Sequence, residues 1–545
     1  MIHRSYISIA QVASFLSTTL AFLLPCISYA LSSRQHTIRN FQVAASNRIP
    51  FSRRQQCPIT SRPPQRIASK RSRLLAADSD EPVTANSYES SSNAIPIDGS
   101  MWPDRFPAQD HCSRCGLCET SFVSKVTDAC AFLGEGMARM DSMEPKVHGR
   151  SRVLDDLAWS SSADYSSSIK DEGRFGVLQE PIQLAKGTET QAQWTGCVTG
   201  IALAMLESNM VDAVVCIASQ NDDSSASSWA VPEPILARTS EEVLRGRGVK
   251  PALAPSLKVL DQIKNDSTIQ KLLFCGVGCA VQAFRAIQDD LKLKEVYVLG
   301  TNCADNSPTP EAANNFIEQG LSVKSESVLG YEFMQDFKVH VKTTDSYVTK
   351  PYFSLPGTIA EPSIAKSCLA CFDYTNGLAD VVVGYMGAPL DSNSRMDESF
   401  QTIAIRNERG VQMVQTAVKA SRLKLHGTAP GKGGHESLSS ATVAADSIVL
   451  SMVGEKDPPE QGMPALMGEI MAFAMRNLGP KGINFARYSV DYHLLRNYLH
   501  ILNEWGEART TMALPASAKE IVEHYLQTDS SFQEIVTKIR AKAKR

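Results

Sequence analysis

Eight of the thirteen cysteines fall into two groups whose spacing is typical of iron–sulfur ligands. The first group begins with two C-x-x-C steps, and a fourth cysteine follows after eleven further residues. Two such steps allow one short loop to direct three thiolates at one cluster. The second group is spread along the chain and ends in another C-x-x-C pair. The first group is Cys112, Cys115, Cys118 and Cys130, and the second is Cys279, Cys303, Cys368 and Cys371.

Four thiolates per cluster predict two four-iron four-sulfur clusters, and therefore a role in electron transfer. The first group departs from the bacterial ferredoxin pattern, in which three residues precede the last cysteine and a proline follows it. Here eleven residues precede Cys130 and Ala131 follows it, so Cys130 could instead complete the other cluster. The structural alternative is a zinc site built by two C-x-x-C pairs. Iron and acid-labile sulfide in anaerobically purified protein would distinguish clusters from zinc.

Clusters carry one electron at a time, whereas most organic reductions take two, so we expect a flavin beside the second group as an adaptor. A predicted helix begins near residues 194–196, where Thr195 is expected to cap it and Gly196 to allow close backbone approach. Free N–H groups of its first turn would face an anionic phosphate. The simpler alternatives are that Thr195 is only a cap and that Arg406 is a surface salt-bridge residue. The candidate flavin contacts are Trp194, Thr195, Gly196, Thr199, Asn376, Arg406 and Asn407.

A reduction of this kind also needs a proton donor. Asp373 and Tyr374 follow Cys371 closely, which holds them near a predicted cluster and the expected flavin, so they are the candidate catalytic residues. The side chains at 491–493 (Asp, Tyr, His) are further donors, but nothing in the sequence places them near a cluster. A lone side chain of these types is more often structural than catalytic.

Strands that alternate with helices are the elements that must position these residues. Apolar runs at 213–217, 272–274 and 296–299 predict strands, and the pattern at 280–287 predicts a helix. This alternation predicts an α/β fold with a mainly parallel, helix-covered sheet. Because the loops beyond the carboxyl ends of parallel strands meet at one edge, we expect Cys279 and Cys303 side by side where ligands bind.

The first 77 residues contain eleven Lys and Arg but no acidic residue, which is typical of a targeting segment. An apolar run at 7–30 and an Arg- and Ser-rich stretch after it predict a bipartite plastid leader; the alternative is a secretory signal or a membrane anchor. Loss of residues 1–77 changes the formal net charge from −3 to −14, so we expect no nucleic-acid partner.

The predicted organisation divides the chain into six parts. They are the leader (1–77), a disordered linker (78–101), an N-terminal ferredoxin-like iron–sulfur segment (102–150), a core for flavin and clusters (185–425), a loose linker (426–460) and a helical C-terminal region (461–545).

These residues lie in strings that resemble a known family, which contains the beta subunits of deazaflavin-reducing hydrogenases. The resemblance is greater to the plastid 7-hydroxymethyl chlorophyll a reductases and the ferredoxin-dependent divinyl chlorophyllide 8-vinyl reductases. It extends from about residue 102 to 525 and includes CSRCGLC, QWTGCVTGIALAMLESNMVDAVVC, LLFCGVGCAVQAFRAI, YVLGTNCADN, YEFMQDFKV, SCLACFDYTNGLADVVVGYMGAP and IAIRNERG. It implies FAD, two four-iron four-sulfur clusters, reduced ferredoxin as electron donor and a chlorophyll-type tetrapyrrole as substrate.

The implied reaction is conversion of 7-hydroxymethyl chlorophyll a to chlorophyll a, because the GTNC and NYLHILNEWG strings resemble that group more. The first alternative is 8-vinyl reduction of divinyl chlorophyllide or protochlorophyllide, since many complex plastids lack chlorophyll b. The second alternative is a non-catalytic electron-transfer subunit of a larger complex. We also expect a homo-oligomer, peripheral contact with a membrane that supplies the pigment, and a basic patch for ferredoxin at Arg238, Arg245, Arg247 and Lys250.

Overall fold

The computed structural model describes residues 110–160, 170–189, 192–219, 228–390, 395–455 and 458–543. The predicted leader and the predicted linker at 78–101 lie outside the described residues, and so does the start of the N-terminal iron–sulfur segment. The described part begins two residues before Cys112 and contains both cysteine groups.

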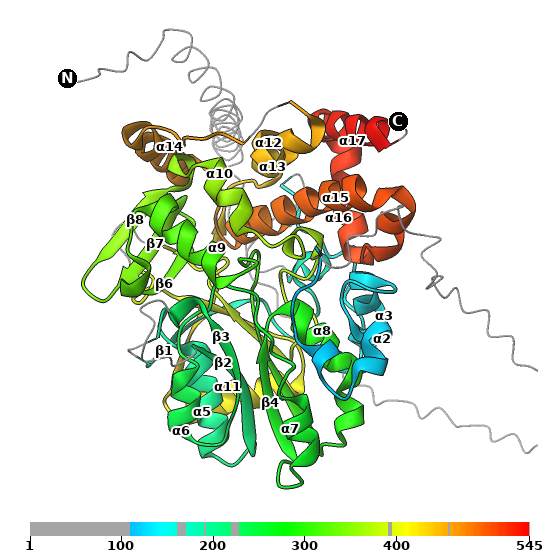
Figure 1. The fold of residues 1–545 in the computed structure, drawn as a ribbon, viewed down its shortest axis with the longest axis vertical. Helices are drawn as coiled ribbons and strands as arrows, with labels where there is room; N and C mark the ends of the chain where they lie inside the picture. The colour runs from blue at the N-terminus through cyan, green and yellow to red at the C-terminus, as the bar shows by residue number, and fades with distance from the viewer. Residues whose placement is uncertain are drawn as a thin grey trace, which may run out of the picture. The chain divides into compact units, whose positions relative to one another are not determined.

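An eight-stranded sheet forms the centre of the fold, in the order β11-β1-β10-β9-β5-β4-β2-β3 (Figure 1). Its middle strands β9, β5, β4 and β2 are parallel, and antiparallel strands extend it on both sides. The α/β fold with a mainly parallel core is confirmed, and the antiparallel flanks add to it. The strands are β1 (Gln183–Gly187), β2 (Ala213–Ser219), β3 (Pro232–Ala237), β4 (Lys271–Gly276), β5 (Glu295–Thr301), β9 (Val381–Gly384), β10 (Gln401–Ile405) and β11 (Leu423–Thr428).

Helices cover both faces of this sheet. Side chains alternate between the two faces along each strand, so each strand packs against helices on both sides. On β2, Val214 and Cys216 pack with α5, α6 and α11, whereas Ala213 and Val215 pack in the cluster that contains α7 and α8. Both faces are therefore buried, as the apolar runs in the sequence predict. The helices are α5 (Cys197–Glu207), α6 (Ser240–Arg245), α7 (Leu260–Asn265), α8 (Gly278–Ile287) and α11 (Glu408–Lys419).

A three-stranded antiparallel sheet lies between β5 and β9 in the sequence. Its strands are β6 (Val328–Phe333), β7 (Lys338–Thr343) and β8 (Tyr347–Pro351), and short helices α9 (Pro310–Asn315) and α10 (Gly357–Ala360) flank it. Val339 and Val341 pack against Phe316 and Ile317. These strands are not predicted from the sequence, because each is short and buries only part of its residues.

The C-terminal region is helical, as predicted, and α15 (Ile483–Ala513) runs through it with most of its residues buried. The expectation of a loose linker at 426–460 is wrong, because α12 (Glu436–Ala445) and α13 (Ser447–Val453) lie there. The Ser- and Ala-rich composition of α12 hides a helix whose Leu438 packs against Phe485 and Tyr488 of α15. The other elements of this region are α14 (Ala465–Leu478), α16 (Ala516–Thr528), α17 (Ser530–Ala543) and the strand pair β12 (Gly431–Lys432) and β13 (Lys481–Gly482).

A buried ionic network connects α15 to α4 (Glu172–Phe175), which precedes the large sheet. Arg174 pairs with Asp171 and with Asp491, each at 2.7 Å, and Arg487 pairs with Asp171 at 2.7 Å. All four side chains are fully buried. Loss of one partner would leave an uncompensated buried charge, which costs about 3–5 kcal/mol. The network therefore fixes α15 relative to the sheet.

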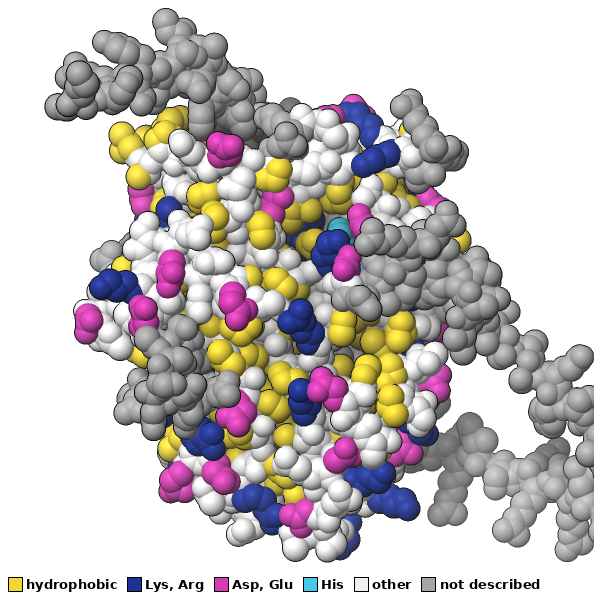
Figure 2. Space-filling model, viewed as in Figure 1, with side chains coloured by type: hydrophobic (Ala, Val, Ile, Leu, Met, Phe, Trp, Pro, Cys, Tyr) yellow, Lys and Arg dark blue, Asp and Glu magenta, His cyan; other side chains and the backbone are white. Residues whose placement is uncertain are grey.

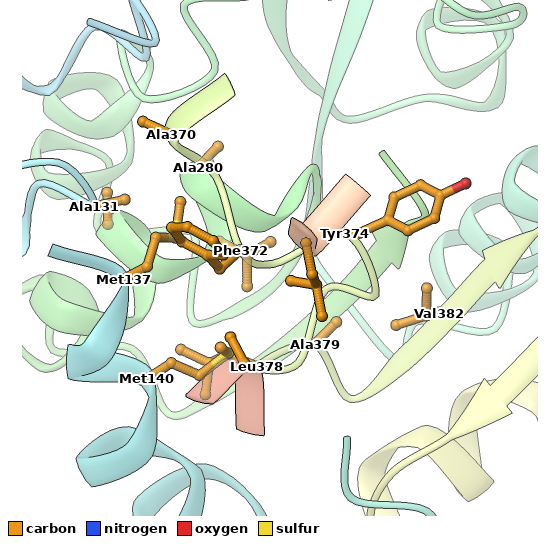
Figure 3. Packing of buried hydrophobic residues seen from close by; sticks show 14 of the residues in the cluster. Ala131, Met137, Met140, Ala280, Ala370, Phe372, Tyr374, Leu378, Ala379 and Val382 are labelled. Atoms are coloured by element: carbon orange, nitrogen blue, oxygen red, sulfur yellow. The ribbon is translucent and has the colours of Figure 1, made fainter. Parts of the chain in front are cut away.

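The N-terminal cysteine segment packs directly on the chain around the second cysteine group. Its helices are α2 (Val126–Ala129) and α3 (Arg139–His148). Met137 and Met140 share one hydrophobic cluster with Phe372 and Leu378 (Figure 3). In the same view Tyr374 points away from these methionines. This packing brings the two cysteine groups into the same region of the protein.

One helix exposes apolar side chains. Leu466, Ile470 and Phe473 of α14 are 74%, 57% and 70% exposed, and Figure 2 shows hydrophobic side chains gathered over this helix at the upper left. The opposite face of α14 packs inward through Met471 and Met475. None of the helices in the described ranges is both long and apolar enough to cross a membrane.

Candidate functional site

A cavity of about 760 Å³ lies beyond the carboxyl ends of β2, β4, β5 and β9, where ligands bind in open parallel sheets. Its size is that of a typical cofactor or ligand site. The large sheet, the small sheet and α15 all contribute to its wall. All four cysteines of the second group and Cys115 of the first group line it.

The first cysteine group is gathered in one place. Cys112 and Cys118 are exposed, whereas Cys115 and Cys130 are half-buried. The Cys115 thiol interacts electrostatically with those of Cys112, Cys118 and Cys130. Gly116 adopts a left-handed backbone (φ 88°), which turns the loop tightly between Cys115 and Cys118. The structure therefore places Cys130 with the first group rather than the second.

The second group is assembled from three loops. Cys279 lies in the first turn of α8 directly after β4, and Cys303 follows β5. Cys368 and Cys371 lie at the start of a short 3-10 helix (Cys368–Ala370) and directly after it. The Cys303 thiol interacts electrostatically with Cys368 and Cys279, and the Cys371 thiol interacts with Cys279 and Cys303.

The two groups adjoin each other. The Ser113 side chain hydrogen-bonds to Cys279, and the Cys279 thiol interacts electrostatically with Cys115. Burial raises the pKa of Cys115 to about 11 and that of Cys368 to about 12. Bound iron would supply the positive charge that such thiols need in order to ionise. The donor set, four thiols in each group, therefore fits one iron–sulfur cluster per group.

Single-ion geometry is a different arrangement. In the described ranges no three His, Cys, Asp or Glu side chains converge so as to hold one metal ion.

Three of the candidate flavin contacts meet at the start of α5. Trp194, Gly196 and Thr199 line the cavity. Thr195 does not cap this helix: Gly196, with φ 81°, is the N-cap residue. The Thr195 hydroxyl instead accepts a hydrogen bond from the Gly187 N–H at 3.1 Å and donates to Gln401 Oε1 at 3.2 Å. The start of α5 is therefore held against the ends of β1 and β10.

A lysine that the sequence predicts at the surface lies in the wall of the same cavity. Lys250 lines the cavity, and its Nζ donates to the carbonyls of Arg247 and Gly248 at 2.7 and 3.0 Å. Burial lowers the pKa of Lys250 to about 8. No carboxylate among the described residues forms a salt bridge with it. The start of α5 and Lys250 together fit an anionic phosphate.

The other candidate flavin contacts do not line the cavity. The Arg406 guanidinium is buried and donates to the carbonyls of Phe175, Val177 and Thr375 at 2.7 to 2.9 Å. It is neither a cavity residue nor the surface salt-bridge residue that its type suggests. The sequence does not distinguish an arginine that binds a phosphate from a buried arginine that stabilises loops.

Asn407 and Asn376 also have structural contacts. The Asn407 side chain caps α11 by accepting a hydrogen bond from the Gly410 N–H at 3.1 Å. Asn376 has a left-handed backbone (φ 55°), and its amide donates to the carbonyls of Gly276 and Thr301 at 2.8 and 3.3 Å. It thus ties together the ends of β4 and β5, from which Cys279 and Cys303 follow.

Asp373 and Tyr374 both line the cavity. Asp373 accepts a hydrogen bond from the Gly377 N–H at 2.6 Å through one oxygen, while its other oxygen is buried with no partner in the described structure. Burial raises the pKa of Asp373 to about 6. The Tyr374 hydroxyl lies 3.1 Å from the Ser489 hydroxyl.

The side chains at 491–493 separate into two environments. Asp491 belongs to the buried ionic network and does not reach the cavity. Tyr492 and His493 line the cavity, and the Tyr492 hydroxyl donates to Asp446 at 2.5 Å. The His493 ring lies 4.9 Å from the Tyr374 ring, centroid to centroid.

Sequence reasoning named only Asp373 among the carboxyls of the cavity wall and missed Asp305, Glu332, Glu361 and Asp446. Glu332 of β6 lines the cavity beside Tyr385 and Trp194, whose rings stack with centroids 5.0 Å apart. The string YEFMQDFKV contains Glu332 but gives it no role. Only the fold of the small sheet brings Glu332 next to residues that lie more than fifty positions away.

Three of the four residues predicted as a basic patch for ferredoxin are ion-paired. Arg238, Arg245 and Arg247 pair with Asp266, Glu233 and Glu189, and Lys250 lies in the cavity wall. Three further basic residues lie in or contact the segment that carries the first cysteine group. Arg114 lies between Cys112 and Cys115 in the sequence, Lys258 packs against Gly116 and pairs with Glu119 at 2.7 Å, and Lys366 pairs with Asp110 at 3.1 Å.

The chain matches known proteins over two adjacent segments that contribute residues to the cavity. Residues 184–261 match the N-terminal part, and 269–430 the C-terminal part, of the family described as Coenzyme F420 hydrogenase/dehydrogenase, beta subunit. The chain is 45% identical over 436 residues to the "7-hydroxymethyl chlorophyll a reductase, chloroplastic" of Oryza sativa subsp. japonica, which covers 80% of this chain and 85% of that protein. It is 37% identical over 426 residues to an uncharacterized protein of Nostoc sp., covering 77% and 95%. It is 29% identical over 259 residues to the "Coenzyme F420 hydrogenase subunit beta" of Methanococcus voltae, covering 46% and 85%.

Proposed function

This chain belongs to the family of 7-hydroxymethyl chlorophyll a reductases, and we propose that it is an iron–sulfur flavoprotein that converts 7-hydroxymethyl chlorophyll a to chlorophyll a. One observation carries the proposal: the similarity to the rice enzyme extends over 436 residues at 45% identity, so it is far longer than any single motif. The cavity lining supports the proposal, because the second cysteine group, Cys115 and three of the candidate flavin contacts border one cavity.

Two four-iron four-sulfur clusters are part of the proposal. The first cysteine group would hold one cluster near the surface, and the second group would hold the other in the cavity wall. The contact of Ser113 with Cys279 supports electron passage from the first group to the second. Electrons would enter from reduced ferredoxin at the exposed side of the first group.

FAD is the proposed second cofactor. When bound, it supplies the conversion between one-electron and two-electron chemistry. The first turn of α5 and Lys250 would hold its phosphate groups, and Trp194 would contribute an aromatic surface. Asn376 keeps a supporting role, because it fixes the two loops that carry Cys279 and Cys303.

The pigment would occupy the aromatic part of the cavity, where the small sheet meets α15. Phe337, Tyr352, Phe485 and Tyr488 line this part. Flat aromatic side chains suit a tetrapyrrole ring. Loss of water from a hydroxymethyl group requires an acid for the leaving oxygen, and the candidates in the cavity are Asp373, Tyr374 and Glu332.

Because a chlorophyll-type pigment is supplied from a membrane, we also propose peripheral membrane contact through the exposed face of α14. Lys432 and Lys481 are exposed and face each other in the β12–β13 pair near the end of α14, which suits anionic lipid headgroups. A plastid location is proposed because the rice relative is described as chloroplastic and the first 77 residues are basic and free of acidic residues. A homo-oligomer remains a prediction.

Anaerobic incubation of the holoenzyme with reduced ferredoxin and each candidate pigment tests the proposal. Formation of chlorophyll a from 7-hydroxymethyl chlorophyll a supports it. Reduction of divinyl chlorophyllide or protochlorophyllide alone would favour the 8-vinyl alternative. No turnover despite full FAD and iron would favour an electron-transfer subunit, the candidate to which the similarity with an F420 hydrogenase subunit beta points.

A further inference from the structure

Glu332 is held in the cavity by groups from three separate parts of the fold. The indole of Trp194, before α5, and the hydroxyl of Tyr385, after β9, interact with its carboxyl. The Phe333 backbone N–H donates to Glu332 Oε1 at 3.3 Å. These contacts fix the position of the carboxyl while it still faces the cavity.

The surroundings of Glu332 are aromatic. Across the ladder, His340 of β7 lies opposite Glu332, but its ring is held by Asp336 at 2.9 Å and by the Tyr347 hydroxyl at 3.0 Å. Neither lysine nor arginine is among the groups in the described structure that move the pKa of Glu332. The phenol groups that interact electrostatically with Glu332 are Tyr331, Tyr352, Tyr374 and Tyr385.

Two other carboxyls in the interior of the described structure, by contrast, have an arginine partner. Asp305 pairs with Arg496 at 2.9 Å, and Glu144 pairs with Arg152 at 2.5 Å. These arginines hold the pKa of both carboxyls below the ordinary value. Glu332 lacks such a partner, and burial raises its pKa to about 7. Near neutral pH its carboxyl therefore exists in both forms, which is the condition for an efficient general acid.

We infer that Glu332 is the proton donor of the proposed reaction and delivers its proton to the hydroxyl oxygen that leaves the pigment. The inference rests on the proposed function. The C–O bond breaks, the oxygen takes the proton of Glu332 and leaves as water, and the carbon receives a hydride equivalent, which is two electrons and one proton. The two electrons come from two molecules of reduced ferredoxin, each of which gives one electron. Solvent supplies the proton of the hydride equivalent and also restores the proton of Glu332.

The two residues predicted for this role fit it less well. Asp373 lies beside the predicted cluster ligands, since it interacts electrostatically with both Cys279 and Cys371. Tyr374 is engaged by Ser489, and burial raises the pKa of its phenol above the ordinary value, so it gives up its proton less readily than a carboxylic acid.

The test compares holoenzyme with Glu332→Gln, which keeps an oxygen that can accept hydrogen bonds from Trp194 and Tyr385 but has no acidic proton. The expected kcat falls at least about 100-fold, while KM for the pigment changes little, because an acid acts on the transition state. The wild-type kcat should fall as the pH rises through about 7, because the protonated acid is lost. The pH profile of the variant should be flat over this range. Glu326→Gln, at an exposed position just before β6, should behave as wild type.

Infrared difference spectra of the holoenzyme give a readout that does not depend on turnover. Wild-type protein and Glu326→Gln should show a protonated carboxyl band that disappears as the pH rises through about 7, and Glu332→Gln should lack it. An absent band, or an unchanged kcat and pH profile in Glu332→Gln, would overturn the inference while wild-type turnover upholds the proposed function. A wild-type holoenzyme that shows the band but reduces no pigment would reject the proposed function and the inference with it.

Discussion

Asn306 donates two hydrogen bonds to the second cysteine group. Its side-chain amide donates to Cys303 Sγ at 3.2 Å, and its backbone N–H donates to Cys368 Sγ at 3.3 Å. Hydrogen bonds to ligand sulfurs stabilise the more negative, reduced form of a cluster and so raise its reduction potential. A single residue outside the cysteine pattern thus contributes to the electron affinity of the proposed second cluster.

We predict that Asn306→Ala lowers the potential of that cluster by roughly 40 mV, the one-electron equivalent of about 1 kcal/mol for one lost hydrogen bond. The backbone hydrogen bond to Cys368 remains, so the cluster should still assemble. A redox titration followed by electron paramagnetic resonance measures the shift. The potential of the other cluster should not change, and Asn315→Ala, at an exposed position on α9, should leave both unchanged. A shift confined to the other cluster would show that Asn306 does not act on the second group.

Helix α14 has two distinct faces. Its inner face includes Met475, which lines the cavity, and its outer face exposes Leu466, Ile470 and Phe473. Spacings of four and three residues place these three side chains on one side of the helix. A membrane contact at this face would bring the cavity close to the source of the pigment.

We predict that Leu466→Ser with Phe473→Ser weakens binding to vesicles of mixed neutral and anionic lipids about 100-fold. Burial of each large apolar side chain is worth about 1.5 kcal/mol or more, and the double variant loses two. Vesicle co-sedimentation measures the effect. Val418→Ser, which changes an apolar side chain 41% exposed on α11, should bind vesicles as the wild type does. Equal vesicle binding by the double variant and wild type would show that α14 does not contact the membrane.

At the scale of the whole molecule, electrons must enter where a cluster approaches the surface. Cys112 and Cys118 are the exposed members of the first group. The basic residues of this segment and its neighbours are Arg114, Lys258 and Lys366, of which Lys258 pairs with Glu119 and Lys366 with Asp110. In the predicted patch, Arg238 and Arg245 likewise form surface pairs, with Asp266 and Glu233. Complementary charge chiefly raises the association rate of an acidic partner, and salt screens it.

We predict that Arg114→Glu raises the KM for ferredoxin several-fold and reduces its salt dependence, because one cation of the docking surface becomes an anion. The kcat with saturating dithionite should not change. Arg245→Glu serves as the matched control, since it reverses a charge in the patch that the sequence suggested. Steady-state assays over a range of ionic strength measure both variants. A larger effect from Arg245→Glu would move the docking surface to that patch.

Much of the fold follows from local sequence patterns. The parallel strands are predicted because both of their faces are buried, which gives continuous apolar runs such as 213–217. The cysteine groups are predicted because C-x-x-C spacing is a local feature. The small sheet is not predicted, because its strands bury only part of their residues, and α12 is hidden by its Ser- and Ala-rich composition.

The site is predicted less completely, because burial and long-range contacts decide the role of a side chain. Trp194, Gly196 and Thr199 lie in the cavity because the start of a helix after a loop is a local signal. Arg406 has the residue type of a phosphate ligand, yet three backbone carbonyls occupy its guanidinium. Glu332 has no local signal, since its partners Trp194 and Tyr385 come from distant segments.

The number of ferredoxin molecules oxidised per pigment reduced tests the central claim most directly. Anaerobic holoenzyme receives 7-hydroxymethyl chlorophyll a and a limiting amount of reduced ferredoxin; chromatography counts the chlorophyll a formed, and absorbance counts the ferredoxin oxidised. The account predicts two ferredoxins oxidised per chlorophyll a, because each carries one electron and the reduction takes two. Ferredoxin oxidation without chlorophyll a, or no oxidation at all in protein with full FAD and iron, would contradict it.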